Sequence, residues 1–122
     1  MPAPRAPSPV PEIGRDQLRA RLAGDDRPKL VMASSDWAFD TKRLPGSLHF
    51  KTIQQMLAAL RPDDDIVVYC SNVDCRASLN AIKKLLEHGY TKVSHYAGGI
   101  IDWESAGLPT EGLWGTPADG GA

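Results

Sequence analysis

IVVYCSNVDCRASLNAIKKLLEHGYTKVSHYAGG, residues 66–99, is the stretch that decides the fold. Its first four residues, 66–69, form an unbroken apolar run, which is typical of a central strand covered on both faces. Residues 77–88 repeat apolar side chains at helical spacing and Gly89 follows as a C-cap, so the longest helix is predicted here. The side chains expected to face inward from that helix are Leu79, Ile82, Leu85 and Leu86. Residues 92–96 then predict another strand.

Similar patterns on either side of this stretch predict the remaining elements. Upstream, these are helices over 16–23 and 52–60, strands over 29–33 and 48–50, and a turn over 44–47. Downstream, a short helix carries Trp103, which is expected in the core. Because strands alternate with helices, we expect an α/β fold with a small, mostly parallel central sheet and helices on both faces. Ligands of such sheets bind beyond the carboxyl ends of the strands, and Cys70 follows the strand 66–69.

Several other side chains are expected to be structural. Trp37 and Phe39 are interpreted as packing for a loop at the sheet edge, with a place at the mouth of a pocket as the alternative. His49 and His95 are expected at the surface, on or beside strands. Trp114 is expected either to fold back onto the body or to be exposed.

Composition divides the 122 residues into three parts and excludes some classes of partner. Residues 1–10 are predicted to be a disordered Pro-rich arm, residues 11–112 a single domain, and residues 113–122 a flexible tail. The net charge of −1 argues against nucleic acid or an anionic membrane as the main partner. No apolar run approaches the ~20 residues of a membrane span, and the Pro-rich start does not resemble a secretory signal. A cytoplasmic location is therefore expected.

The chain holds two cysteines, Cys70 and Cys75, on one short segment. A disulfide framework would connect distant segments, which this pair cannot do. Two cysteines with three scattered histidines show no zinc-ligand spacing, so neither a metal nor another cofactor is expected. The two cysteines are therefore either reactive or merely packed.

The segment that follows Cys70 could form an anion-binding cradle. A loop that returns to a helix N-terminus directs backbone N–H groups inward, and these donors together with the helix dipole stabilise a thiolate at its base. Arg76 adds a positive charge and a bidentate donor for an oxyanion. The predicted cradle consists of Ser71, Asn72, Val73, Asp74, Cys75 and Arg76. The alternative is that Cys70 is a small buried apolar residue at the end of a strand.

Four motifs follow one another in this part of the chain: Val67-Val68-Tyr69-Cys70, Arg76-Ala77-Ser78, Gly89-Tyr90-Thr91-Lys92-Val93 and Gly98-Gly99-Ile100-Ile101-Asp102-Trp103. In order and spacing they resemble the second half of a rhodanese domain. Leu44-Pro45-Gly46-Ser47 is similar to the family's His-Ile-Pro-Gly-Ala turn, with Arg43 in place of the histidine, and Ala106-Gly107-Leu108-Pro109 is similar to its usual end.

The resemblance implies a single-domain sulfurtransferase that forms a persulfide on Cys70. The catalytic cysteine would take sulfane sulfur from a donor such as thiosulfate, and the loop from Ser71 to Arg76 would bind the persulfide and the leaving oxyanion. The partners implied are a small sulfur-containing anion or persulfide donor and a thiophilic acceptor such as a thiol. Neither nucleic acid nor a membrane is implied, and the oligomeric state stays open.

The sequence departs from the family pattern at three places. The loop has five residues between Cys70 and Arg76 where rhodaneses have four, and a C-x5-R loop is found in phosphatases and arsenate reductases of the same fold. Asp74 lies where thiosulfate-using members often carry a basic residue, which weakens the field for anions unless its carboxylate points to solvent. Ala33-Ser34-Ser35 replaces the usual Asp-Val/Ala-Arg.

These departures keep two further functions open. One is a C-x5-R phosphatase or arsenate reductase, and the other is a catalytically silent binding or sensing module. Cys75 has two interpretations of its own. It either resolves the persulfide by forming a disulfide with Cys70, or packs inward at the helix start.

Overall fold

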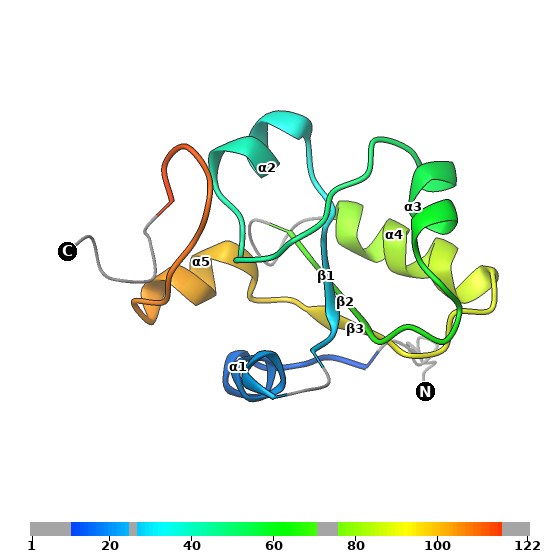
Figure 1. The fold of residues 1–122 in the computed structure, drawn as a ribbon, viewed down its shortest axis with the longest axis horizontal. Coiled ribbons are helices and arrows are strands. Elements are labelled where there is room, and N and C mark those ends of the chain that lie inside the picture. The colour runs from blue at the N-terminus through cyan, green and yellow to red at the C-terminus, as the bar shows by residue number, and fades with distance from the viewer. Residues whose placement is uncertain (1–10, 25–26, 71–75, 116–122) are drawn as a thin grey trace, which may run out of the picture.

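A computed structural model of the protein describes residues 11–24, 27–70 and 76–115, with Arg76 described by its backbone alone. Figure 1 shows helices and strands alternating along the chain. The helices are α1 (Arg15–Ala23), α2 (Asp36–Thr41), α3 (Ile53–Ala59), α4 (Arg76–Glu87) and α5 (Gly99–Ser105). The strands are β1 (Lys29–Met32), β2 (Ile66–Tyr69) and β3 (Val93–Tyr96).

The three strands form one parallel sheet in the order β1-β2-β3. Residue by residue, Met32 on β1 lies beside Tyr69 on β2, which lies beside Tyr96 on β3, so the carboxyl ends of all three strands meet at one edge. Every residue of β2 is buried, as its unbroken apolar run predicts. β2, the strand directly before Cys70, is therefore the central strand of the sheet.

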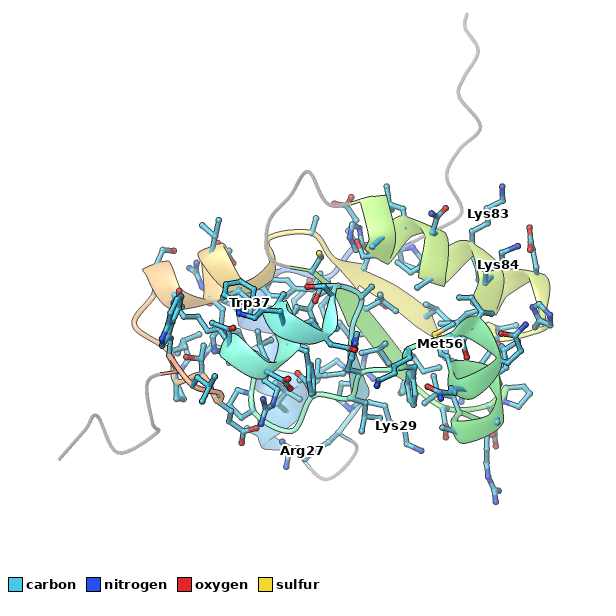
Figure 2. All side chains as sticks on the ribbon, turned by 90° about the horizontal axis from the view of Figure 1, so that it is seen from above. Arg27, Lys29, Trp37, Met56, Lys83 and Lys84 are labelled. Carbon is cyan, nitrogen blue, oxygen red and sulfur yellow. The ribbon has the colours of Figure 1, made fainter. Side chains whose placement is uncertain are left out.

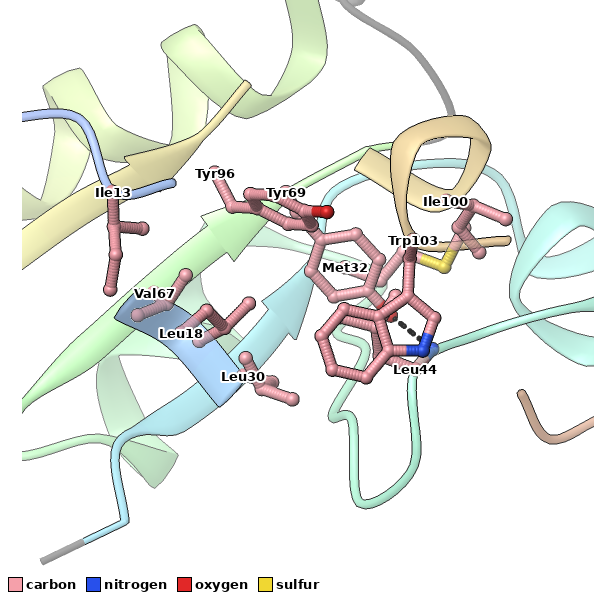
Figure 3. Close-up of a cluster of buried hydrophobic side chains, with 10 residues drawn as sticks. All are labelled: Ile13, Leu18, Leu30, Met32, Leu44, Val67, Tyr69, Tyr96, Ile100 and Trp103. Atoms are coloured by element: carbon pink, nitrogen blue, oxygen red, sulfur yellow. Dashed lines mark hydrogen bonds between the residues drawn. The ribbon is translucent and has the colours of Figure 1, made fainter. Parts of the chain in front are cut away.

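Helices cover both faces of the sheet, which confirms the predicted α/β architecture (Figure 1). Successive side chains of a strand point to opposite faces of the sheet, so alternate strand residues belong to two separate hydrophobic cores. Figure 3 shows the core beneath α1 and α5, made by Ile13, Leu18, Leu30, Met32, Leu44, Val67, Tyr69, Tyr96, Ile100 and Trp103. The core beneath α3 and α4 is made by Val31, Met56, Leu60, Ile66, Val68, Ala81, Ile82, Leu85, Tyr90 and Val93.

The longest helix, α4, ends at Glu87, and the predicted cap residue Gly89 follows. The φ of Gly89 is 88°, in the left-handed region that favours glycine. The N–H of Tyr90 then reaches back to the carbonyl of Leu85 at 3.1 Å. One detail of the prediction for this helix is wrong, because Leu79 is 50% exposed and Ser78 is buried in its place. A small residue at this inward position lets the first turn of α4 approach β3 closely.

Two segments between β1 and α3 differ from prediction. Residues 36–41, interpreted as a loop, form the short helix α2, because the Ser35 hydroxyl accepts the N–H of Ala38 at 3.1 Å and caps the first turn. Residues 48–50 form no strand; Leu48 alone makes an isolated bridge to Val31. The chain at this point turns away towards α3 after two backbone hydrogen bonds with β1.

One more side chain has surroundings that differ from those expected. His95, expected at the surface, is only 7% exposed, because it lies two residues after Val93 and so shares the face of β3 that α4 covers. At the other end of the chain, the N–H groups of Leu113 and Trp114 donate to the carbonyls of Asp40 and Thr41. The predicted boundary at residue 112 stays a prediction, although these two residues contact α2.

Within the described residues, none of the helices has the length and apolar character that a membrane crossing requires.

Candidate functional site

Cys70 is the residue at which the sheet, α4 and α5 come together. It follows β2 directly and is 5% exposed. Its carbonyl accepts the N–H of Ile100 in the first turn of α5 at 3.2 Å, and the preceding carbonyl, of Tyr69, accepts the N–H of Ala33 at 2.8 Å. The backbone of Cys70 is therefore held from the β1 side and from the α5 side.

Tyr69, which precedes Cys70, fastens this edge of the sheet to the turn at 44–47. Its side chain is fully buried; its hydroxyl accepts the N–H of Leu44 at 2.9 Å and lies 2.6 Å from the Ser47 hydroxyl. The dashed line in Figure 3 marks the contact with Leu44. Burial raises the pKa of Tyr69 to about 12, so the phenol stays protonated and acts as a structural hydrogen-bonding group.

The predicted anion-binding loop falls largely outside the described residues. Ser71, Asn72, Val73, Asp74 and Cys75 all lie there, and so does the choice between a resolving and a packed Cys75. Arg76 is the first residue of α4, which is 12 residues long. The described ends of the segment, Cys70 and Arg76, thus lie at the end of a central strand and at the N-terminus of the longest helix.

A buried polar pair lies beneath the start of α4. The Ser78 hydroxyl is 3.0 Å from Nε2 of His95, and the two residues are 1% and 7% exposed. Burial lowers the pKa of His95, while the charge of Glu12 opposes that shift. The pair joins the helix that begins at Arg76 to β3. Sequence reasoning missed this pair, although the spacing of two residues between Val93 and His95 puts both on one face of the strand and could have placed His95 beneath α4.

An open groove of about 250 Å³ lies on the face of the sheet that α3 and α4 cover, and its lining includes Ala33, whose N–H donates to the carbonyl of the residue before Cys70. Its apolar lining includes Val31 on β1, Phe50 in the segment before α3, and Ile53 and Met56 on α3. Figure 2 shows Met56 on α3 next to α4. Its polar lining consists of Ser34, Lys51, Thr52 and Asn80. Nothing in the sequence indicates this groove, since its wall is assembled from four separate segments.

The Ser34 hydroxyl has an unusual environment. Among the described residues it is the buried side-chain polar atom that has no hydrogen-bond partner. Buried polar groups in proteins are almost always paired, so an exception calls for an explanation. Ser34 lies in the Ala33-Ser34-Ser35 segment, where the sequence departs from the usual family pattern, and its neighbour Ser35 caps α2.

The aromatic side chains of α2 have separate environments. Phe39 is partly buried, stacks on the His49 ring at 5.0 Å and carries the guanidinium of Arg43 over its face at 4.7 Å. Trp37 is 66% exposed and meets the ring of Trp114 edge to face at 5.9 Å. Phe39 thus packs as expected, whereas Trp37 lies largely in solvent with Trp114.

In the part of the chain that the structure describes, no three histidine, cysteine, aspartate or glutamate side chains gather as metal ligands would.

Comparisons with known proteins agree with the resemblance seen in the sequence. A profile of the family described as the rhodanese-like domain matches residues 15–106. A sulfurtransferase of Allochromatium vinosum is 30% identical over 102 residues, which are 82% of this chain and 94% of that protein.

Two further matches show the same domain in other settings. The HTH-type transcriptional regulator Rv0324 of Mycobacterium tuberculosis is 30% identical over 107 residues, which are 85% of this chain and 46% of the regulator. The rhodanese-like domain of the Alr3790 protein from Anabaena sp. has the same fold, with a TM-score of 0.75 at 23% identity. That match covers 85% of this chain and 80% of the Anabaena chain.

Proposed function

Since this chain belongs to the rhodanese-like domain family, we propose that it transfers sulfane sulfur through a persulfide on Cys70. The observation that carries the proposal is the place of Cys70, at the carboxyl end of the central strand and directly before the segment that leads to α4. The sulfurtransferase of Allochromatium vinosum, which this chain matches along almost its whole length, supports the same class of reaction.

The first half of the reaction needs a thiolate at Cys70. The N-terminus of α4 carries a partial positive charge, and loop N–H groups directed at the sulfur lower the pKa of a thiol. The thiolate attacks the outer sulfur of thiosulfate, the S–S bond of the donor breaks, and its electron pair leaves with sulfite. The product is Cys70–S–S⁻, and no oxidant or reductant is consumed. We assign the binding of the leaving oxyanion to Arg76 and the loop N–H groups from Ser71 to Cys75.

In the second half, a thiophilic acceptor removes the outer sulfur and restores the thiolate. Cyanide would yield thiocyanate, and a thiol would yield its own persulfide. Cys75 is a candidate for resolving the persulfide from within the chain: its thiolate would attack the Cys70 sulfur, the bond between the two persulfide sulfurs would break, and the outer sulfur would leave as hydrosulfide, which leaves a disulfide between Cys70 and Cys75. No general base is needed, because the attacking group of each step is already an anion.

The central experiment measures thiocyanate formation from thiosulfate and cyanide, together with the mass of the protein after incubation with thiosulfate alone. We expect turnover and a mass increase of one sulfur atom, both lost in Cys70→Ser. The matched variant Cys75→Ser keeps the persulfide but loses any disulfide formed under mild oxidant. Absence of both the persulfide and thiocyanate in the native chain, with other sulfane donors also tested, would refute the proposal.

Two rival functions predict different results in the same set of assays. A C-x5-R phosphatase or arsenate reductase would hydrolyse an aryl phosphate or reduce arsenate in a Cys70-dependent manner. A binding or sensing module would show neither activity. The five-residue spacing between Cys70 and Arg76 favours the first rival, and the replacement of the usual Asp and Arg by Ala33-Ser34-Ser35 favours the second.

A further inference from the structure

We propose that the groove between β1, α3 and α4 binds the organic part of the sulfur acceptor, and that this acceptor is a small thiol carrying a carboxylate. The inference rests on the proposed sulfur transfer and specifies the substrate of its second half. Three observations carry it: the position of the groove, the unpaired hydroxyl of Ser34, and the charge of the groove lining.

The groove adjoins the reactive position on the side of β1. Ala33, which lines it, donates its N–H to the carbonyl of Tyr69, the residue before Cys70. Neighbouring strands lie ~4.8 Å apart, so the groove begins about one strand spacing from the cysteine. Its opposite wall includes Ala77, the residue directly after Arg76. A ligand in the groove therefore lies against Ala33, which is bonded to the residue before Cys70, and against Ala77, which follows Arg76.

Ser34 supplies a hydrogen-bonding group that the described part of the fold does not use. Its hydroxyl has no partner there, although burying an unpaired polar group destabilises a protein. Rotation about the Cα–Cβ bond turns such a hydroxyl between staggered positions without moving the backbone. An acceptor with an oxygen atom at this point of the groove would satisfy the group. Thr52 offers a second hydroxyl, whose oxygen already caps α3 and whose proton remains available to a ligand.

The charge of the lining selects against a cationic ligand. Among the described residues that line this groove there is no aspartate or glutamate, and Lys51 supplies its charged group. The Lys51 side chain is 71% exposed, and its ammonium lies 3.8 Å from the Asp36 carboxylate, a weak surface contact that the carboxylate of a ligand can replace. A larger cavity beside α1 has three carboxylates in its lining, Glu12, Asp16 and Asp102, against the one cation Arg15 among its described residues. The groove that Lys51 lines therefore suits a carboxylate better than that cavity does.

The size of the groove limits the ligand. Its 250 Å³ lies below the ~300–1,000 Å³ of pockets that enclose drug-sized molecules, so a compact thiol fits better than a large cofactor. The apolar side chains of Met56 and Ile53 would contact the short carbon chain of such a thiol. The thiolate would attack the outer sulfur of Cys70–S–S⁻, the bond between the two persulfide sulfurs would break, and the electron pair would return to the Cys70 sulfur. The acceptor would leave as R–S–S⁻, with no net oxidation.

The test uses three thiols with the same two-carbon chain: β-mercaptopropionate, β-mercaptoethanol and cysteamine. They end in a carboxylate, a hydroxyl and an ammonium, respectively. The native protein is supplied with thiosulfate, and the KM is measured for each thiol and for cyanide, which needs no groove. Each acceptor is compared between variants rather than with the other acceptors, since the three thiols differ in their own pKa.

Ser34→Ala is expected to raise the KM for mercaptopropionate by about tenfold relative to the KM for cyanide, the effect of one lost hydrogen bond to a charged group. Lys51→Gln is expected to raise it roughly threefold, to leave the native KM unchanged for mercaptoethanol, and to lower the KM for the cationic cysteamine. The matched control is Lys83→Gln, which removes the same charge from an exposed position on α4 (Figure 2). This control should change the KM for none of the thiols.

A purely structural role for Ser34 predicts something else. In that case Ser34→Ala, which removes an unpaired buried hydroxyl, leaves the Tm unchanged or raises it, and the KM stays at its native value for every acceptor. If Ser34→Ala and Lys51→Gln keep the native ratio of the KM for mercaptopropionate to the KM for cyanide, the groove proposal is overturned while the proposed sulfur transfer stands. If the native protein forms neither thiocyanate nor a Cys70 persulfide with any sulfane donor, both proposals fall together, so the cyanide reaction and the mass of the protein distinguish the two failures.

Discussion

His95 holds its imidazole 3.0 Å from the Ser78 hydroxyl, on the strand beside the one that ends at Cys70. Because burial disfavours the charged form of the ring, its pKa is lowered in the folded protein. In the unfolded chain the same ring is expected to titrate near its ordinary pKa of 6.5. The two states therefore bind protons differently in mildly acidic solution.

This difference predicts a loss of stability as the pH falls. Below about pH 6.5 the unfolded chain takes up a proton that folded His95 does not, so the free energy of unfolding decreases until the lowered folded pKa is passed. We expect the Tm of the native protein to fall between pH 7 and pH 5, and His95→Gln to reduce that slope while keeping a partner for Ser78. The measurement is thermal unfolding across this pH range.

The control for this prediction is His88→Gln. His88 is exposed near the end of α4, so its loss should leave the pH dependence of the Tm as in the native protein. An unchanged slope in His95→Gln would show that this ring does not couple folding to pH.

Residue by residue, the sequence allowed the place of Cys70 at the end of the central strand to be predicted but not its surroundings, and the reactivity of Cys70 stays a prediction. Cys70 could be placed, because an apolar strand ends there and a helix begins a few residues later. Ser34 could not be identified, since nothing in the sequence says which buried hydroxyl will lack a partner. The Tyr69 hydroxyl was missed for a similar reason: its contacts with Leu44 and Ser47 join residues 25 and 22 positions apart.

At the scale of single elements, α4 allows a direct comparison between two apolar residues on different sides of one helix. Ile82 is fully buried against the sheet, whereas Leu79 is 50% exposed. We predict that Ile82→Ala lowers the free energy of unfolding by about 2–5 kcal/mol, because it leaves a cavity in a packed core. Leu79→Ala should change it by no more than about 0.5 kcal/mol. Urea unfolding of both variants measures the difference, and equal losses would contradict the observed orientation of α4.

The elements that were predicted well are those with a long periodic pattern. The strand 66–69 and the helix that follows it could be predicted because the first is wholly apolar and the second repeats its apolar residues over three turns. The helix α2 could not, since six residues are too few to show a period, and its formation depends on the cap that Ser35 provides. The strand expected at 48–50 failed because apolar character alone does not show whether a neighbouring strand has space to pair.

For the whole molecule, a sharp prediction concerns where the folded body ends. A chain that stops at Gly112 loses the two hydrogen bonds from Leu113 and Trp114 to α2, together with the contact between Trp37 and Trp114. We expect it to be less stable by about 1–2 kcal/mol than a chain that stops at Gly115. Thermal or urea unfolding of the two truncated chains decides this. Equal stabilities would support the boundary at 112 that composition predicts.

The architecture of the whole chain followed from the sequence more readily than its chemistry did. Alternating strands and helices fix a parallel sheet, and a parallel sheet fixes the edge at which Cys70 lies. The substrates proposed for Cys70 depend on features that many distant residues build together. The groove illustrates this, because its lining comes from β1, the segment before α3, α3 itself and α4.

The sheet also divides the interior of the described chain into two cores that share no side chain. Substitutions separated in this way tend to have additive effects on stability, since they have no common neighbours. Evolution could therefore reshape the face that carries the groove, and with it the choice of acceptor, without disturbing the core beneath α1 and α5. A scaffold partitioned in this manner lets one half of the molecule change its specificity while the other half preserves the fold.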